Sequence, residues 1–315
     1  MQKGNFCMKR KSGLSKFNSF LAVVLVICLI ATAIVIYKYP VIVETTEGEN
    51  NASTGEEVVI DEFVAGTYGG KEFATVEDVV NYYVECYNYT KTLTTSYTEN
   101  GDPKTFYKLL GDEKLEVKNL LVEGKSNSML DGLVPGIVGN LFNGNVISLP
   151  PSGNRDPKTD TRGDNGEFDC TTSSLTVDDV AMANVVDNGD GTINITIQPK
   201  EVILSMPGKD AQGRFFNSLG DISGVVESIS VLSFSEGTID ENFVVAYKGG
   251  TGTVTIDTKT GEITTADYEM DVHIDVKHAN VAVLKNKSAS LDIVYTNHFP
   301  ASAEYMKESR GVVLG

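Results

Sequence analysis

Apolar and polar residues alternate with a period of two over much of the chain after Leu175. The alternation is clearest in three segments, VTID at Val254–Asp257, MDVHIDV at Met270–Val276 and ASLDIVY at Ala289–Tyr295. Successive side chains of a β-strand point to opposite faces, so this pattern gives each strand one apolar and one polar face. Glycine and asparagine separate the segments, as expected of short turns. The pattern therefore predicts an antiparallel sheet with one buried face and one solvated face.

The segment VVDNGDGTINITIQP, Val185–Pro199, resembles a calcium loop at first sight. An EF-type loop needs oxygen ligands at positions 1 and 12 and a glycine at position 6. Aligned on its second glycine, the segment has Val186 and Ile197 at those two ligand positions. Glycine and asparagine tolerate positive φ, and the flanks look like paired strands, so Asn188–Gly191 is predicted to be a hairpin turn. A second hairpin turn is predicted at Thr258–Gly261.

The segment TVEDVVNYYVECYNYTK, Thr75–Lys91, has a helical pattern. Thr75 can N-cap the helix, and Glu77 and Asp78 suit the positive end of its dipole. The apolar residues form one stripe, with Cys86 at its edge: Val76, Val79, Val80, Tyr83, Val84 and Tyr87. We therefore predict an α+β fold, a curved antiparallel β-meander packed against one or two amphipathic helices. Within Lys104–Gly124, short helical pieces and one strand at LEVKNLLVE both fit.

A second amphipathic segment, SNSMLDGLVPGIVGNLFNG, has an unusual composition for a helix. Asp131 is the single charged residue between Asn127 and Val146, and Pro135 and three glycines interrupt the pattern. Proline and glycine weaken a helix in water, so two interpretations stay open: a buried, kinked core helix, or a mobile flap over an apolar cavity. In the second case the candidate ligand-binding residues are Met129, Leu130, Leu133, Val134, Ile137, Val138, Leu141 and Phe142.

An uncharged apolar run, FLAVVLVICLIATAIVIY, occupies Phe20–Tyr37. As a helix it is about 27 Å long, close to the hydrocarbon thickness of a bilayer. Five basic residues precede the run, which predicts a cytoplasmic N-terminus and an extracellular remainder. A cleaved signal peptide would end near Ala31-Thr32-Ala33, but Ile34–Ile36 continue the apolar run, which favours an uncleaved anchor. A lipoprotein is excluded because Ile27 precedes Cys28.

Four regions follow from these features. Residues 1–19 form a cytoplasmic basic head, and residues 20–37 form a transmembrane signal-anchor helix. Residues 38–65 are a polar, acidic stretch expected to be a flexible linker. Residues 66–315 form the extracellular α+β domain, with a helical part at about 75–145 and a β-rich part at about 170–300.

Charge and cysteine content limit the partners. The net charge is −17 and no Asp or Glu precedes Glu44, so the part beyond the anchor is strongly acidic. Such a surface repels nucleic acid, which we exclude as a partner. Cys86 and Cys170 are the two cysteines expected outside the cell, where disulfides persist. They are either a candidate disulfide or two unpaired small hydrophobic residues.

Catalytic motifs are not found in the sequence, and we predict no catalytic residue and no cofactor. The metal candidates are Asp271, His273 and Asp275, which share one face of a strand. Three such residues on one straight strand span too far for one ion, so a further ligand such as His298 or an acid would have to come from elsewhere. The alternative is a solvated strand face opposite a buried one.

The order of features resembles that of membrane-anchored surface proteins of clostridia and related Gram-positive bacteria. The resemblance rests on the basic head, anchor and linker, the TVEDVV helix, the DNGDGT hairpin and the TIDTKTGEI hairpin. It implies a location in the bacterial cytoplasmic membrane and no particular activity. The layout also resembles that of lipoprotein carriers, curved half-barrels that hold acyl chains, although fold does not fix function.

The expected function is a non-enzymatic extracellular binding or interaction module that holds a lipid or other apolar ligand between sheet and helix. The alternatives are a structural or sensory ectodomain with an envelope protein or cell-wall partner, and a metal-dependent hydrolase at Asp271, His273 and Asp275.

Overall fold

The computed structural model describes residues 57–126, 148–151, 172–218, 220, 232–281 and 284–314. Its elements are β1 (Gly66–Tyr68), β2 (Lys71–Phe73), α2 (Val76–Thr90), β3 (Thr94–Glu99), β4 (Asp102–Tyr107), β5 (Asp112–Val122), β6 (Lys125–Ser126), η1 (Val177–Asp179), β7 (Val180–Asp187), β8 (Thr192–Pro199), β9 (Val202–Ile203), α5 (Ala211–Phe215), β10 (Leu232–Phe234), α7 (Ile239–Asn242), β11 (Phe243–Tyr247), β12 (Thr251–Asp257), β13 (Ile263–Val281), β14 (Leu284–Phe299), α8 (Ala303–Arg310) and β15 (Val312–Leu314).

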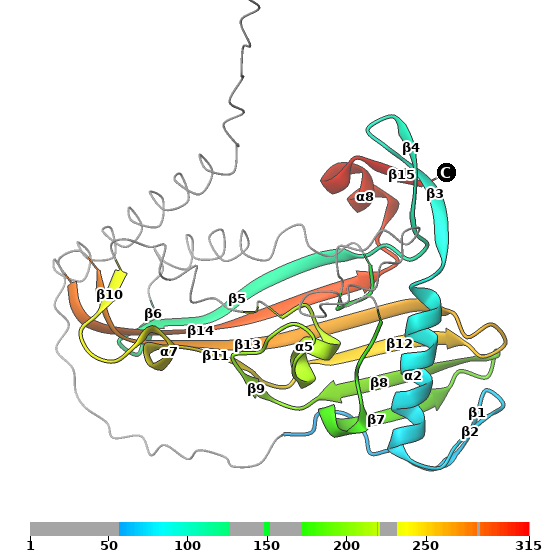
Figure 1. Ribbon diagram of the computed structural model, residues 1–315, viewed down its shortest axis with the longest axis horizontal. Coiled ribbons are helices and arrows are strands. Elements are labelled where there is room, and N and C mark those ends of the chain that lie inside the picture. The colour runs from blue at the N-terminus through cyan, green and yellow to red at the C-terminus, as the bar shows by residue number, and fades with distance from the viewer. Residues whose placement is uncertain are drawn as a thin grey trace, which may run out of the picture.

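A large antiparallel sheet is the centre of the fold (Figure 1). Within the described residues it has ten strands, with the main path β6-β5-β14-β13-β12-β8-β7. Beside this path β10 and β11 pair with β13, and β9 pairs with β11. Strands β12, β13 and β14 follow one another as a meander, whereas β5 pairs with β14 from far earlier in the chain. The predicted antiparallel sheet is confirmed.

Burial alternates along the central strands as the sequence predicts. In β13, Tyr268 and Val272 are each 2% exposed, whereas Glu269 is exposed to solvent. We call the face that packs on α2 and α5 the inner face, and the opposite face the outer face. Both predicted hairpin turns form, since β7 pairs with β8 across Asn188–Gly191 and β12 pairs with β13 across Thr258–Gly261.

Helix α2 begins at the predicted cap and buries most of the predicted stripe, with Val76 and Val84 partly buried. The Thr75 hydroxyl accepts a hydrogen bond from the Asp78 N–H at 3.2 Å, and the Asp78 carboxylate accepts one from the Thr75 N–H at 2.8 Å. This reciprocal pair is a capping box, which satisfies backbone donors at the start of the helix. The buried side chains of α2 are Val79, Val80, Tyr83, Cys86, Tyr87 and Thr90.

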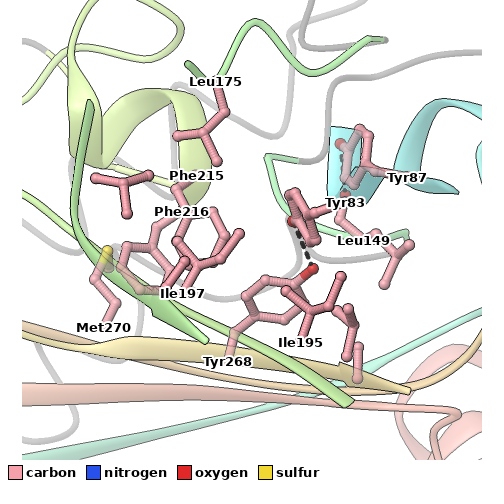
Figure 2. Packing of buried hydrophobic residues seen from close by; sticks show 14 of the residues in the cluster. Tyr83, Tyr87, Leu149, Leu175, Ile195, Ile197, Phe215, Phe216, Tyr268 and Met270 are labelled. Carbon is pink, nitrogen blue, oxygen red and sulfur yellow. Dashed lines mark hydrogen bonds between the residues drawn. The ribbon is translucent and has the colours of Figure 1, made fainter. Parts of the chain in front are cut away.

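An aromatic cluster joins α2 and α5 to the inner face (Figure 2). The hydroxyl groups of Tyr83 and Tyr268 lie 3.0 Å apart, and each side chain is 2% exposed. The Phe215 ring centre lies 5.5 Å from that of Tyr268 and 5.7 Å from that of Tyr83. Gly252 on β12 permits this packing, because a Cβ there would lie 2.5 Å from Phe215 Cζ.

A segment before β1, Glu57–Asp61, contacts the sheet, and we call it the strap. The side-chain amide of Gln198 on β8 donates to the Glu57 carbonyl at 2.6 Å and accepts from the Val59 N–H at 2.9 Å. The Asn184 side chain on β7 donates to the carbonyl of the last strap residue at 3.1 Å. Gln198 is 0% exposed. Side chains of β7 and β8, rather than backbone pairing, therefore attach the strap.

A second, three-stranded sheet, β15-β3-β4, lies with α8 at one end of the main sheet (Figure 1). It has its own small core, made of Tyr97, Tyr107, Leu110, Ala301 and Met306. The segment Lys104–Gly124, for which helical pieces and a strand both fitted, contains the end of β4 and all of β5.

The α+β class is confirmed, and antiparallel sheet predominates over helix. In the part of the chain that the structure describes, no helix is long and apolar enough to span a membrane. The basic head, the Phe20–Tyr37 anchor and the linker as far as residue 56 lie outside the described residues, so they stay predictions.

Candidate functional site

Polar side chains cover the outer face in rows that cross the strands. Residues paired in an antiparallel sheet point to the same face, so each row can be followed through the register. One row contains Lys118 on β5, Asp292 on β14, His273 on β13 and Ala246 on β11. This row contains one of the metal candidates and brings a polar residue from each of three strands together.

His273 lies between two carboxylates. Its Nδ1 is 2.5 Å from Asp292 Oδ1, and its Nε2 is 3.3 Å from Asp275 Oδ2. The Asn119 side-chain amide donates to the other Asp292 oxygen at 2.7 Å. Asn119 has a φ of 50° where the β5–β14 register shifts, so a bulge turns this side chain toward Asp292. With Asp271 on the same face, we call these five residues the His273 cluster.

Two half-buried carboxyl groups of the cluster have opposite pKa shifts. Burial raises the pKa of Asp271, and the nearby charges of Glu269 and Asp292 add to this effect. Burial alone would also raise the pKa of Asp292, but hydrogen bonds from His273 and Asn119 outweigh it and lower the pKa below its usual value. Asp292 is therefore held as a carboxylate.

The metal interpretation gains no support from this geometry. Asp271, His273 and Asp275 do share the outer face, as predicted, but Asp275 and Asp292 face the two ring nitrogens of His273. A carboxylate at Asp292 can only accept, so the Nδ1 that contacts it is the donor and has no lone pair for a metal ion. His298, the proposed extra ligand, instead contacts Asp267 at 2.6 Å. Among the described residues no group of three or more His, Cys, Asp or Glu can hold a metal ion.

Asp292 and Asn119 were missed by the sequence reasoning. The alternation in ASLDIVY already placed Asp292 on the polar face, so one signal was present. The register that sets it opposite His273 is a long-range property of the sheet and was not predictable from the pattern.

The side-chain oxygens of the Asn188–Gly191 turn hold the turn itself. Asp187 accepts from the Gly69 N–H at 2.7 Å and from the Gly189 N–H at 2.8 Å. Asp190 accepts from the Thr192 hydroxyl at 2.6 Å and from the Thr192 N–H at 2.9 Å. These hydrogen bonds lower the pKa of both carboxyl groups. The geometry is that of a hairpin turn docked on the β1–β2 turn.

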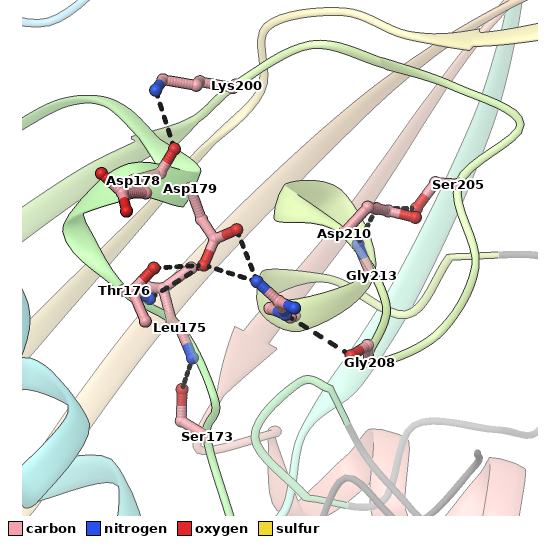
Figure 3. Close-up of polar contacts among 11 residues, drawn as sticks. Ser173, Leu175, Thr176, Asp178, Asp179, Lys200, Ser205, Gly208, Asp210 and Gly213 are labelled. Carbon is pink, nitrogen blue, oxygen red and sulfur yellow. Dashed lines mark hydrogen bonds and ion pairs between the residues drawn. The ribbon is translucent and has the colours of Figure 1, made fainter. Parts of the chain in front are cut away.

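A largely buried ion pair holds α5 near the start of β7 (Figure 3). Arg214 contacts both carboxylate oxygens of Asp179, at 2.8 and 3.1 Å. The Asp179 carboxylate also accepts from the N–H and the hydroxyl of Thr176, each at 2.9 Å. Asp210 caps α5 by accepting from the Gly213 N–H at 2.9 Å. Since these carboxylates are engaged in capping and pairing, we interpret the network as structural.

Lys91, directly after α2, is 2% exposed. Its ammonium group donates to the Ser148 hydroxyl at 2.6 Å and to the Leu149 carbonyl at 3.1 Å, and lies 4.9 Å from the Tyr107 ring centre. Hydrogen bonds and a ring face stabilise a buried cation. Ser148 is 1% exposed, so the pair is shielded from solvent and attaches residues 148–151 to the helix.

Two further predictions fall on undescribed residues. The eight candidate ligand-binding residues from Met129 to Phe142 lie outside the described residues. Cys170 does too, so the candidate disulfide stays a prediction. Cys86, the other cysteine of the candidate disulfide, is 1% exposed, and burial raises the pKa of the Cys86 thiol to about 11.

Comparison of the chain with protein-family models, curated proteins and solved structures finds no match. The functional argument therefore rests on the residues of this chain.

Proposed function

We propose that the chain is a non-enzymatic binding or interaction module, held outside the bacterial cytoplasmic membrane by Phe20–Tyr37. The proposal rests on the length of the sheet compared with that of the helix that packs on it. Strand β13 has 19 residues and α2 has 15. These lengths correspond to about 63 Å of strand and about 22 Å of helix. Helix α2 crosses the strands near one end of the sheet (Figure 1), so it covers a small part of their length.

The chemistry of the outer face supports recognition rather than catalysis. The side chain of Asp267 on β13 is 69% exposed and contacts the His298 ring. His273 is engaged with two carboxylates. A face of exposed charges and hydroxyl groups suits the binding of a polar macromolecule. We propose that this macromolecule is an envelope protein. Such a surface gives specificity through complementary charges.

The lipid-holding form of the proposal has weaker support. It needs the Met129–Phe142 segment and therefore rests on the sequence alone. In the described part, the inner face beneath α2 and α5 is filled by aromatic rings, among them Tyr83, Phe215 and Tyr268. A filled face leaves little room for an acyl chain there.

Two measurements on the full chain test the proposal. A photo-crosslinking side chain placed at Glu269, on the exposed outer face, should give a discrete protein product in whole cells. The same side chain placed at the buried Tyr247 should give none. Native mass spectrometry from detergent should show no retained lipid mass. A native-only lipid mass would favour the carrier form. Stoichiometric zinc that is lost in His273→Ala would favour the metal-dependent hydrolase.

A further inference from the structure

Strand β7 forms one end of the main sheet, and among the described residues no strand pairs with its outer backbone edge, although β1 lies near it. It pairs with β8 and with no other strand there. An edge strand has a row of N–H and C=O groups on every second residue that can pair with another chain. The neighbours on this side, the strap and the β1–β2 turn, bind through the side chains of Gln198, Asn184 and Asp187.

The other end of the sheet has protection that β7 lacks. Strand β5 carries Lys114, Glu116 and Lys118, and its register is interrupted by a bulge at Asn119. Charges and bulges on an edge strand prevent pairing with other chains. In contrast, Val180–Val186 of β7 reads VAMANVV and has no charged residue. This difference between two edges of one sheet indicates that pairing at β7 is permitted.

The surroundings of the β7 edge define the partner. Exposed acidic residues stand at both ends of the strand, Asp178 before it and Asp187 and Asp190 after it. The strap adds Glu57 and Asp61, also exposed. Two basic side chains near Asp178 are already engaged, since the Lys200 ammonium group donates to the Asp178 carbonyl at 2.7 Å and Arg214 is paired with Asp179. Asp178 and Asp187 are about 30 Å apart along an extended chain.

We infer that the β7 edge is a docking site for an extended segment of a partner protein, uncharged in its centre and basic at both ends. The segment adds a strand to the sheet, so backbone hydrogen bonds supply affinity and the flanking charges supply orientation. Val186, 53% exposed, and Val59, 60% exposed, supply apolar contact. A second copy of β7 fits poorly, because either orientation places acids beside acids.

This inference rests on the proposed interaction function, whose partner it specifies. The probe is a fluorescein-labelled peptide, KKVTVTVTVKK, titrated against the full chain in detergent micelles. Saturable binding that weakens with added salt is expected, together with slower hydrogen exchange of β7 amides. The acid-flanked peptide EEVTVTVTVEE should not bind. A version N-methylated on every residue of the VTVTVTV centre, which cannot form the ladder through either edge, should not bind either.

Two matched variants test whether the peptide binds at the β7 edge. Val186→Lys adds a repelling charge at the edge and should weaken the lysine peptide about fivefold or more. Val313→Lys makes the same change on β15 at 51% exposure and should leave affinity unchanged. Equal binding of the two flanked peptides, binding by the N-methylated peptide, or equal effects of the two variants would overturn the inference. If no peptide binds while crosslinking from Glu269 still gives a protein product, the β7 edge is not the docking site, but the proposed interaction function stands.

Discussion

The hydrogen bond between Tyr83 and Tyr268 gives a quantitative test of how the inner face is built. The two oxygens are 3.0 Å apart, each side chain is 2% exposed, and burial raises the pKa of both hydroxyl groups. Tyr83→Phe leaves the Tyr268 hydroxyl buried without this partner, which should lower the free energy of unfolding by about 1–3 kcal/mol. Tyr268→Phe should cost a similar amount. The double variant replaces both groups by apolar ones of the same shape and should lie close to wild type.

The assay is a double-mutant cycle in guanidinium chloride, followed by far-ultraviolet circular dichroism of the full chain in detergent. Circular dichroism is chosen because the chain has no tryptophan. With each single variant losing about 1–3 kcal/mol and the double variant close to wild type, the coupling energy between the two positions should be about 2–6 kcal/mol. Tyr89→Phe on the same helix, at 43% exposure, is the control and should change the free energy of unfolding by less than about 0.5 kcal/mol. Additive losses from the two single variants would refute the argument.

Three further predictions use the same unfolding assay. Gly252→Ala brings a Cβ to 2.5 Å from the Phe215 ring, so overpacking should cost about 1–3 kcal/mol. Adding Phe215→Leu should recover part of that loss; if it recovers none, the clash lies elsewhere. Thr75→Ala removes the capping box and should cost about 1 kcal/mol, whereas an unchanged midpoint would show that the cap is dispensable. The lowered pKa of Asp292 means that its stabilisation is present above its unfolded pKa, about 3.9, and is lost as pH falls through its folded pKa. Asp292→Asn should therefore reduce the fall in melting temperature below about pH 4. If the melting temperature of the variant falls as much as that of the wild type, the lowered pKa of Asp292 does not contribute to stability.

Local patterns predicted the local structure well. The capping sequence at Thr75 and the apolar stripe after it placed α2, because both signals lie within one segment. The alternation around Met270–Val276 placed the inner and outer faces of β13 for the same reason. Turn chemistry at Asn188–Gly191 placed the β7–β8 hairpin and excluded the EF-type loop.

Contacts between distant segments were not predictable from local patterns. The sequence contained Asp292 and His273 on polar faces, but their pairing depends on the register of β14 against β13. Asn119 joins them because a bulge in β5 turns it, and no local signal marks that bulge. The strap was assigned to a linker from its polar composition, yet the buried amide of Gln198 binds its backbone. A residue that binds a remote backbone leaves no periodic trace in the sequence.

The pairing of β5 with β14 has a consequence for how the chain acquires its structure. Glu113 on β5 and its hydrogen-bond partner Tyr295 on β14 are 182 residues apart. At a synthesis rate of about 5–20 residues per second, β5 is made roughly 10–35 s before the strand that it pairs with. During that time its apolar residues Leu115 and Val117, which pack on the core in the finished sheet, have no sheet to pack against. If the chain is exported as it is made, β5 stays unpaired outside the cell until β14 has been made. Its alternating lysine and glutamate residues keep this unfinished strand soluble.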